Sequence, residues 1–410
     1  MKLLRVEFDG EELFKGSNFS FDLFASDRVM KPNDGERLSD VFKLEGTRSI
    51  YSQNVIGISG VNASGKTTAI NLLQFAAEYL AMPCTVRSDR FSNMIPAKLG
   101  PHFIFRAIFW HESGVYAIIA RIDRRMGKED SNWYRIADEQ VYELPPQNLT
   151  KNLLESVEGF AKQATLIISR NARPGEAGAL TDEERTFLRD DMSVVMAVTR
   201  RRIIDHCEMS GHLDRLPYPV ALVDAFDSSV EYLCWDPESE VYRLKFHGEE
   251  ERSLSRDAAE AQLSFGTLVG SELVLQAVGI LQDGGVMLVD GMECGLSKPL
   301  VKTIIDLFLS ASTNPKGAQL IFTTHYPEIL DFLPRKDDVY LLVRDTDHKT
   351  DAVKYSSRVK RIENKKSEVV LSNYIKGTMP NYPGIRDLRS FVRESIGSIG
   401  GSSDEQQPRS

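Results

Sequence analysis

The stretch VIGISGVNASGKTTAINLL, residues 55–73, decides the fold of this 410-residue chain. Its beginning, VIGISG, is typical of a buried parallel strand, and from Thr67 onward apolar residues recur at helical spacing. Between the two lies GVNASGKT, which matches GxxxxGK followed by Ser or Thr; here glycines let backbone N–H groups wrap phosphates. In this pattern Lys66 reaches the β- and γ-phosphates and Thr67 holds Mg²⁺. The stretch therefore predicts a strand, a phosphate-binding loop and a helix.

Asp290 follows a second apolar run, in GVMLVDGMECGLSK at residues 285–298. Four apolar residues before an aspartate predict a buried strand that delivers a carboxylate to the Mg²⁺ of a bound triphosphate. Hydrophobic strands that end in Asp are common, so this strand alone is weak evidence for a metal-binding carboxylate. Its position downstream of a phosphate loop makes that evidence stronger. We predict that Asp290 and Thr67 are the metal-associated residues.

Two further motifs are weak alone and gain meaning from their order along the chain. LSFGT, residues 263–267, precedes an apolar helix, and a serine, a glycine and a helix N-terminus suit a γ-phosphate presented by another protomer. LIFTTH ends at His325, which could hydrogen-bond a γ-phosphate or an attacking water. An ordinary helix cap at Ser264 or Thr267, and a structural histidine, are the alternative interpretations.

Composition and charge are those of an ordinary globular chain. Hydrophobic residues make up 42% and charged residues 27%, and the formal net charge of −9 disfavours an indiscriminate nucleic-acid coat. The basic residues 200–202 are interpreted as a solvated helix face rather than a phosphate contact. Cys84, Cys207, Cys234 and Cys294 are scattered without a CxxC pair, so no zinc site, redox couple or disulfide is predicted. With no secretory signal and no run of about 18 apolar residues, we expect a cytoplasmic protein without a membrane partner.

The order of the patterns predicts an α/β fold in two lobes with an insertion. LLRVEFDG and NFSFDLFAS predict two early strands, and HFIFRAIFW and GVYAIIARID predict an antiparallel pair. Residues 181–207 predict a helical lid that starts with a capping box of Thr181 and Glu184, and strands are expected to resume at residues 218–226. After about residue 261, helices and buried strands alternate as in a parallel α/β lobe. The predicted division is 1–90 for the N-terminal part with the phosphate loop, 91–215 for a β-hairpin and helical insertion, 216–396 for the C-terminal part and 397–410 for a disordered tail.

Together the GxNxSGKT loop, the LSFG signature, the strand ending in Asp290 and the TTH ending resemble the ABC-type ATPase heads of SMC and RecF-like proteins. More narrowly, they resemble the AAA-family ATPases of bacterial abortive-infection and other anti-phage modules. VALVDAFDSSVEYL and NYIKGTMPNYPGIRDL are also similar to segments that these ATPases carry. The resemblance spans most of the chain and is weakest from about residue 91 to residue 216. It implies an ABC-type P-loop head with a mixed β N-terminal lobe, a parallel α/β C-terminal lobe and a β and helical insertion.

For such heads the resemblance implies a head-to-tail homodimer or higher homo-oligomer. ATP and Mg²⁺ would lie between the phosphate loop of one protomer and the signature of the other. The nucleotide-binding residues carried over by position belong to these two motifs: Gly60, Asn62, Ala63, Ser64, Gly65, Lys66, Thr67, Thr68, Ser264 and Gly266. Thr67 and Asp290 are the metal pair, and Lys66, Glu293 and His325 carry the catalytic roles. No residue is assigned to the glutamine that usually links the nucleotide to the insertion.

One departure from the family pattern concerns catalysis. These heads typically place a glutamate directly after the aspartate of the strand, whereas this sequence has Gly291 there and its next acid is Glu293. Loss of a positioned general base costs roughly 10²- to 10⁴-fold in rate. The loop, Lys66 and the metal still hold the triphosphate. We therefore expect an ATPase with tight ATP binding and slow turnover, unless Glu293 serves as the base.

Three functions fit this pattern. The favoured one is a nucleotide-gated sensor or scaffold that controls a partner effector, of nuclease or toxin type, in anti-phage defence. The alternative is a RecF-like DNA-repair ATPase; the acidic net charge disfavours DNA binding, and no sustained heptad supports the long arms of an SMC protein. An ATPase subunit of a membrane transporter shares the motif order but lacks such a long insertion. The insertion is the expected docking place for the partner or trigger.

Overall fold

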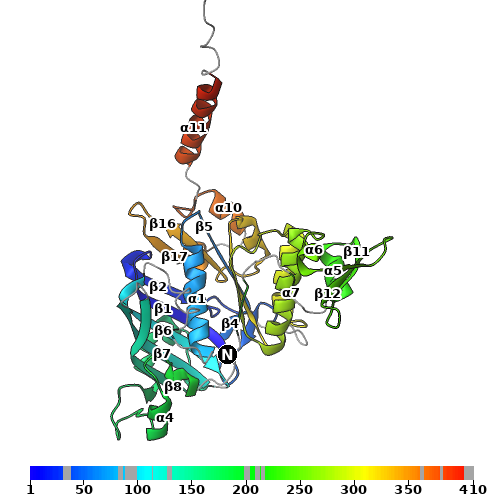
Figure 1. The fold of residues 1–410 in the computed structure, drawn as a ribbon. Coiled ribbons are helices and arrows are strands. Elements are labelled where there is room, and N and C mark those ends of the chain that lie inside the picture. Colours follow the sequence, from blue (N-terminus) through cyan, green and yellow to red (C-terminus); the bar gives the residue numbers. More distant parts are fainter. Residues whose placement is uncertain are drawn as a thin grey trace, which may run out of the picture.

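The computed structural model describes residues 1–30, 38–81, 86–87, 99–112, 114–126, 132–197, 204–207, 213, 218–360, 364–378 and 382–400. Two six-stranded sheets form the body of the molecule, and helix α1 (Lys66–Ala81) lies between them (Figure 1). This arrangement confirms the α/β class expected from the sequence.

The N-terminal sheet is antiparallel and has the order β2-β1-β6-β7-β8-β9. Its strands are β1 (Lys2–Glu11), β2 (Asn18–Asp22), β6 (Leu99–His111), β7 (Gly114–Met126), β8 (Asn132–Leu144) and β9 (Thr165–Ser169). The sequence analysis expected a separate insertion from residue 91, whereas β6 pairs directly with β1 along most of its length. Strand pairing across 90 residues of chain is not readable from local alternation, which predicted the strands but not their partner.

The core sheet has the order β10-β14-β15-β5-β16-β17 and is parallel except for β17. Its strands are β5 (Val55–Gly60), β10 (Ile204–Cys207), β14 (Val286–Val289), β15 (Gln319–Thr324), β16 (Val339–Arg344) and β17 (Thr350–Lys354). The inner strands are almost continuously buried because helices or the second sheet cover both faces. A short hairpin of β3 (Val41–Lys43) and β4 (Tyr51–Gln53) precedes β5.

The helices divide between the two faces of the core sheet. On one face α1 packs through Phe75 against Phe8 and Phe105 of the N-terminal sheet, with ring centroids 5.6 Å apart in both pairs. On the other face lie α7 (Phe265–Asp283) and α8 (Lys298–Leu309), in a second hydrophobic cluster. Shorter helices complete the fold: α3 (Val157–Ala161), α4 (Asp182–Phe187), α5 (Val220–Phe226), α6 (Arg256–Glu260), α9 (Tyr355–Arg358), α10 (Lys366–Leu371) and 3-10 turns at Lys15–Ser17, Pro146–Asn148, Asn152–Glu155, Val194–Ala197 and Pro327–Phe332. The chain ends in α11 (Tyr382–Gly400).

A small module precedes α7 and has a core of its own. It contains the three-stranded sheet of β11 (Val230–Asp236), β12 (Val241–Phe246) and β13 (Arg252–Leu254), covered by α5 and α6. The strands at VEYLCWD and EVYRLKF are confirmed. The strand expected at residues 218–226 is wrong, because this segment forms α5 after Pro219, where apolar residues pack onto β11.

Two other expectations are corrected by the structure. The helical lid at residues 181–207 is helical only in α4, whose capping box of Thr181 and Glu184 is confirmed, and in a 3-10 turn. Residues 204–207 form β10, which pairs in parallel with β14 and extends the core sheet. The sequence analysis expected a disordered tail at residues 397–410. Its first residues, 397–400, instead form the end of α11, which runs to Gly400. The basic residues 200–202 and the side chains of Cys84 and Cys207 lie outside the described residues; Cys234 and Cys294 are free thiols.

Helix α7 is the one helix of the described ranges that is long and apolar enough to cross a membrane by length and composition, and half of it is buried. Its buried residues Val269, Leu273 and Ala277 pack in the cluster beneath β14. The apolar content of α7 is thus explained by core packing. The cytoplasmic location stays a prediction.

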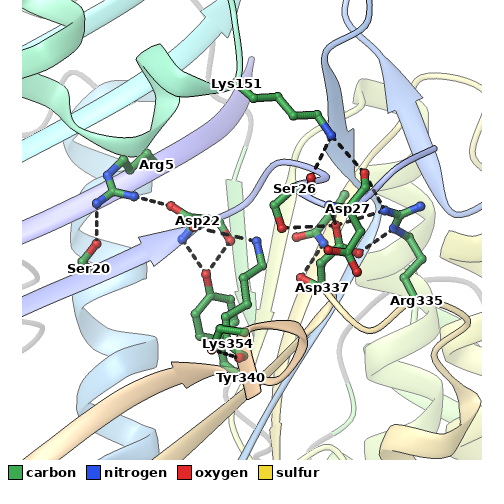
Figure 2. A network of polar contacts seen from close by, with 12 residues as sticks. Arg5, Ser20, Asp22, Ser26, Asp27, Lys151, Arg335, Asp337, Tyr340 and Lys354 are labelled. Atoms are coloured by element: carbon green, nitrogen blue, oxygen red, sulfur yellow. Dashed lines mark hydrogen bonds and ion pairs between the residues drawn. The ribbon is translucent and has the colours of Figure 1, made fainter. Parts of the chain in front are cut away.

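A network of buried polar contacts ties the N-terminal sheet to the core sheet (Figure 2). Arg335 binds both carboxylate oxygens of Asp337, at 2.8 and 3.0 Å, and Asp337 accepts the backbone N–H of Asp27 at 2.7 Å. On the other side of the network, the Tyr340 hydroxyl accepts the Asp22 N–H at 2.9 Å. Burial acts to raise the pKa of Asp337, but its bonds to Arg335 hold that pKa below its usual value. The carboxylate therefore stays charged inside the joint between the two sheets.

We predict that Arg335→Ala lowers the free energy of unfolding by about 3–5 kcal/mol, because it leaves a buried carboxylate without its partner. The matched control is Arg243→Ala, which breaks a surface pair with Asp236 in which the Arg243 side chain is 47% exposed. That variant should unfold close to the wild type, because solvent screens an exposed ion pair. Chemical denaturation measures both. Losses of equal, small size would show that the joint does not depend on this ion pair.

Candidate nucleotide-binding site

Four parallel strands of the core sheet end at one edge and deliver the predicted motifs there. β5 ends at Gly60 before the phosphate loop, β14 is followed by Asp290, β15 by His325, and β16 ends at Arg344. The neighbour order β14-β15-β5-β16 places these residues in a row, because parallel strands have their carboxyl ends at the same edge. Motifs separated by up to 265 residues thus meet around the start of α1.

A cavity of about 640 Å³ opens at this edge. Its size is within the range of small-molecule sites. The predicted residues that line it are Ala63, Gly65, Lys66, Thr67, Thr68, Asp290 and His325. It is also lined by residues to which the sequence analysis assigned no binding role: Glu11, Leu13, Asn71, Gly291, Cys294 and Arg344. No glutamine is among these lining residues of the described part of the chain.

The glycines of the loop are required by close contacts. A Cβ on Gly60 would lie 2.5 Å from the carbonyl oxygen of Leu342 on the neighbouring strand β16. Gly65 has φ +93°, and a Cβ there would lie 2.6 Å from Leu13, which follows β1. Side chains at these two positions would push the loop away from β16 and from the N-terminal sheet.

Two side chains of the β16–β17 hairpin hold the loop backbone. The Arg344 guanidinium donates to the Ala63 carbonyl at 3.1 Å, and the Thr350 hydroxyl donates to the Ser64 carbonyl at 2.9 Å. Both bonds use carbonyl oxygens, so these two side chains do not occupy the N–H groups with which such a loop binds phosphate. The sequence analysis missed Arg344 and Thr350; the only signal was their place at the ends of apolar strands.

Lys66 lies at the base of the cavity. Its Nζ donates to the carbonyl oxygens of Gly60 at 2.8 Å and Val61 at 3.1 Å. Burial lowers the pKa of Lys66, and the carboxylates of Asp290 and Glu293 partly oppose this. A phosphate that enters the loop would supply the negative charge that a buried ammonium favours.

Thr67 and Asp290 form a pair that fits Mg²⁺. The Thr67 hydroxyl donates to Asp290 Oδ2 at 2.6 Å, and Thr323 donates to Oδ1 of the same carboxylate. A hydroxyl and a carboxylate are hard oxygen ligands of the kind that Mg²⁺ takes, with waters and phosphates completing its shell. Within the described part of the chain, no group of three or more His, Cys, Asp or Glu side chains could hold a metal alone. A bound triphosphate would therefore have to supply part of the coordination.

Gly291 occupies the place where a catalytic glutamate was expected, and its backbone explains the glycine. Its φ is +73°, in the left-handed region that favours glycine, and a Cβ would lie 2.9 Å from Cys294 Sγ. Its N–H donates to Thr323 Oγ1 at 2.8 Å, so this turn is fixed to β15. The chain therefore turns sharply after Asp290 instead of presenting a side chain to the cavity.

Glu293, the candidate substitute base, points elsewhere. Its Oε1 accepts the backbone N–H of His325 at 2.7 Å. It lines a neighbouring cavity of about 350 Å³ with Leu296, Lys298 and Tyr326, among others, and it is not among the residues that line the 640 Å³ cavity. In this arrangement Oε1 of Glu293 fixes the turn that carries His325, while Oε2 is buried without a hydrogen-bond partner.

The signature residues Ser264 and Gly266 lie outside the cavity, at the N-terminus of α7. Ser264 is the N-cap: its hydroxyl accepts the Thr267 N–H at 3.1 Å, as the alternative interpretation stated. Gly266 rests against the loop that follows Asp290, where a Cβ would collide with the carbonyl oxygen of Gly295. The signature thus contacts the loop after Asp290 in its own chain and does not line its own cavity.

Comparisons with known proteins give a fold likeness and little more. No protein-family model matches the sequence, and no curated protein matches it. Among solved structures, the chain is similar to the SMC head domain from Thermotoga maritima, with 13% sequence identity, a TM-score of 0.40, and coverage of 86% of this chain and 99% of that chain. A likeness at this level transfers no site, substrate or partner.

We predict opposite effects for alanine at two glycines. Gly291→Ala should lower the free energy of unfolding by about 1–2 kcal/mol, because alanine resists a left-handed φ. Gly279→Ala, inside α7 where nothing lies within 4 Å of a new Cβ, should raise it by about 0.5–1 kcal/mol. Denaturation of the two variants beside the wild type measures both. If Gly291→Ala were as stable as the wild type, the turn after Asp290 would not need its glycine.

Proposed function

We propose that this protein is an ATP-binding switch of the ABC/SMC-like kind that hydrolyses ATP slowly. One observation carries the proposal: the phosphate loop, Lys66, the Thr67–Asp290 pair and His325 surround a single cavity of nucleotide size. Each group has a chemical role toward a triphosphate. None of them has a comparable role toward an uncharged ligand.

Binding follows from the charges and donors at the cavity. The loop N–H groups and the start of α1 favour the β- and γ-phosphates, and Lys66 exchanges its two carbonyl contacts for phosphate oxygens. Thr67 and Asp290 would hold Mg²⁺ through oxygen ligands, and the ion would offset the negative charge of the phosphates. Arg344, which lines the cavity, keeps its bond to the loop backbone and adds positive charge.

Hydrolysis is slow in this proposal because the position directly after Asp290, where the family pattern has its catalytic glutamate, carries no carboxylate. Gly291 offers no side chain, and Glu293 is bound to the His325 N–H outside the cavity. His325 lines the cavity and can orient a water or contact a γ-phosphate. ATP would therefore remain bound for long periods, which suits a switch better than a motor.

The site of one chain is incomplete without a second copy. Ser264 and Gly266 do not line the cavity, so a signature contact to the γ-phosphate has to come from another protomer. In the proposed head-to-tail pair, ATP contacts both surfaces and stabilises only the closed state. Within each chain, Gly266 of the signature touches Gly295 of the loop after Asp290. A conformational change at the nucleotide of one chain would therefore reach that chain's signature, which contacts the nucleotide of the second chain.

The biological role in the proposal is control of a partner effector in anti-phage defence. It is supported by the motif order and by the resemblance to ATPases of abortive-infection modules. Closure on ATP would hold or release the effector, and slow hydrolysis would set how long that state lasts. The effector's identity is left to experiment.

We predict that the wild type binds ATP with Mg²⁺ but turns over below about 0.1 s⁻¹, an order of magnitude under the usual lower limit for enzymes. Lys66→Ala should abolish binding, which a fluorescent ATP analogue measures. Glu293→Gln should change turnover no more than Glu328→Gln, its matched control on the same neighbouring cavity. Turnover that is fast in the wild type and falls 10²-fold in Glu293→Gln would make Glu293 the base and end the slow-switch proposal.

A further inference from the structure

Helix α11 extends away from the rest of the molecule (Figure 1). The apolar side chains on it that are 42 to 65% exposed are Tyr382, Ile385, Leu388, Phe391, Val392 and Ile396. An isolated helix of about this length is marginal in water, and most helices owe their stability to a packed apolar face. Monomeric proteins rarely expose an apolar patch of more than a few hundred Å². The helix therefore needs a partner surface.

The spacing on α11 is that of a helix that pairs with another helix. Ile385, Leu388, Val392 and Ser395 fall at successive a and d positions of a heptad. The hydroxyl of Ser395 donates to the Phe391 carbonyl of its own helix at 2.9 Å, so it brings no unsatisfied donor into such a seam. The pattern runs from residue 385 to residue 395, about one and a half heptads, which suits a short helix pair rather than a long coiled coil.

The polar side of α11 argues against a lipid surface. Membrane-surface helices are rich in Lys and Arg, whereas α11 carries both signs: three basic residues, Arg386, Arg389 and Arg393, against two acidic ones, Asp387 and Glu394. The whole chain also carries a net charge of −9, which anionic lipid would repel. A protein surface is the better match for this helix.

The exposed area favours a second copy of this chain. Six side chains of this size, each about half exposed, offer on the order of 500 Å² per copy. A symmetric pair uses the same surface twice and reaches about 1,000 Å², the lower limit for a specific interface. The chain also has a reason to meet a second copy, because its signature residues do not line its own cavity.

The segment before α11 is anchored at the nucleotide edge of the core sheet. A Cβ on Gly377 would lie 2.5 Å from Val343 Cγ1 and 3.2 Å from the carbonyl oxygen of Arg344. Arg344 in turn binds the Ala63 carbonyl of the phosphate loop. The helix therefore starts close to the edge at which two copies would have to meet around ATP.

We propose that α11 pairs with α11 of a second copy without needing nucleotide. Pairing holds the nucleotide-binding edges of two copies near each other, at a high effective concentration. The two copies then close around ATP without first having to meet in solution. The pairing is separate from the ATP switch, because Lys66 and the other loop residues take no part in it. Lys66→Ala should therefore pair as the wild type does.

The test compares two arginine substitutions on opposite sides of α11, in the full chain without nucleotide. Analytical ultracentrifugation at low micromolar concentration should give a dimer for the wild type, for Lys66→Ala and for Ser390→Arg, which lies opposite the apolar stripe. Leu388→Arg, at the centre of the stripe, should give a monomer with an at least tenfold weaker self-association. The thermal unfolding midpoint of Leu388→Arg should equal that of the wild type, since Leu388 is exposed in the single chain.

A cross-linking experiment tests direct contact between the helices. Val392 lies near the middle of α11, so its copy is close in either a parallel or an antiparallel pair. Under mild oxidation Val392→Cys should form a disulfide-linked dimer at least tenfold faster than Ser390→Cys, which shares the same native cysteines. A wild type that stays monomeric, a Leu388→Arg variant that remains dimeric, or equal cross-linking rates would overturn the proposal. So would sedimentation of the wild type, but not Leu388→Arg, with anionic phospholipid vesicles, which would assign α11 to a membrane.

Discussion

The parallel pairing of β5 with β15 and β16 is the constraint on which the nucleotide site depends. Its register places Gly60 beside Leu342 and Ser59 beside Thr324. The phosphate loop, the residue after β15 and the end of β16 therefore lie at the same edge of the sheet. The first contact is so close that only glycine fits at position 60. A shift of one residue would turn every side chain to the other face and separate the loop from its supports. The site is therefore a property of the whole sheet and not of the loop alone.

The N-terminal sheet contributes to the same site through its connection to the core. Leu13, which follows β1, packs on Gly65, while the Thr350 backbone N–H donates to the Leu13 carbonyl at 2.9 Å and its hydroxyl holds the loop. The Arg335–Asp337 ion pair connects the N-terminal sheet and the core sheet at a second place, away from the phosphate loop. Because both sheets press on α1, the phosphate loop is held from three sides before any nucleotide arrives. Such preorganisation lowers the cost of ordering the loop on binding.

How much the sequence could predict depends on how local each signal is. The phosphate loop, α1, the strand before Asp290 and the TTH ending were readable because spacing within a few residues determines them. The partner of β6, the strand β10 and the support from Arg344 depend on contacts across the fold, for which a single sequence has no local signal. The helix at residues 218–226 was read as a strand because a short apolar run fits both structures, and packing on β11 decided between them. The sequence shows that the glycine after Asp290 departs from the family pattern, but it does not show that this glycine has a left-handed φ.

That glycine links the chemistry of the site to its regulation. The turn it permits carries the chain from Asp290 to Glu293, which holds the His325 N–H, and on to Gly295, which touches the signature at Gly266. One short loop thus joins Asp290, the backbone at His325 and the N-terminus of α7. A glutamate in place of the glycine would need the same left-handed backbone, so a catalytic base and this turn compete for one position. In the proposed switch, a chain that keeps the turn keeps a connection from the nucleotide to the signature, and slower hydrolysis is the consequence.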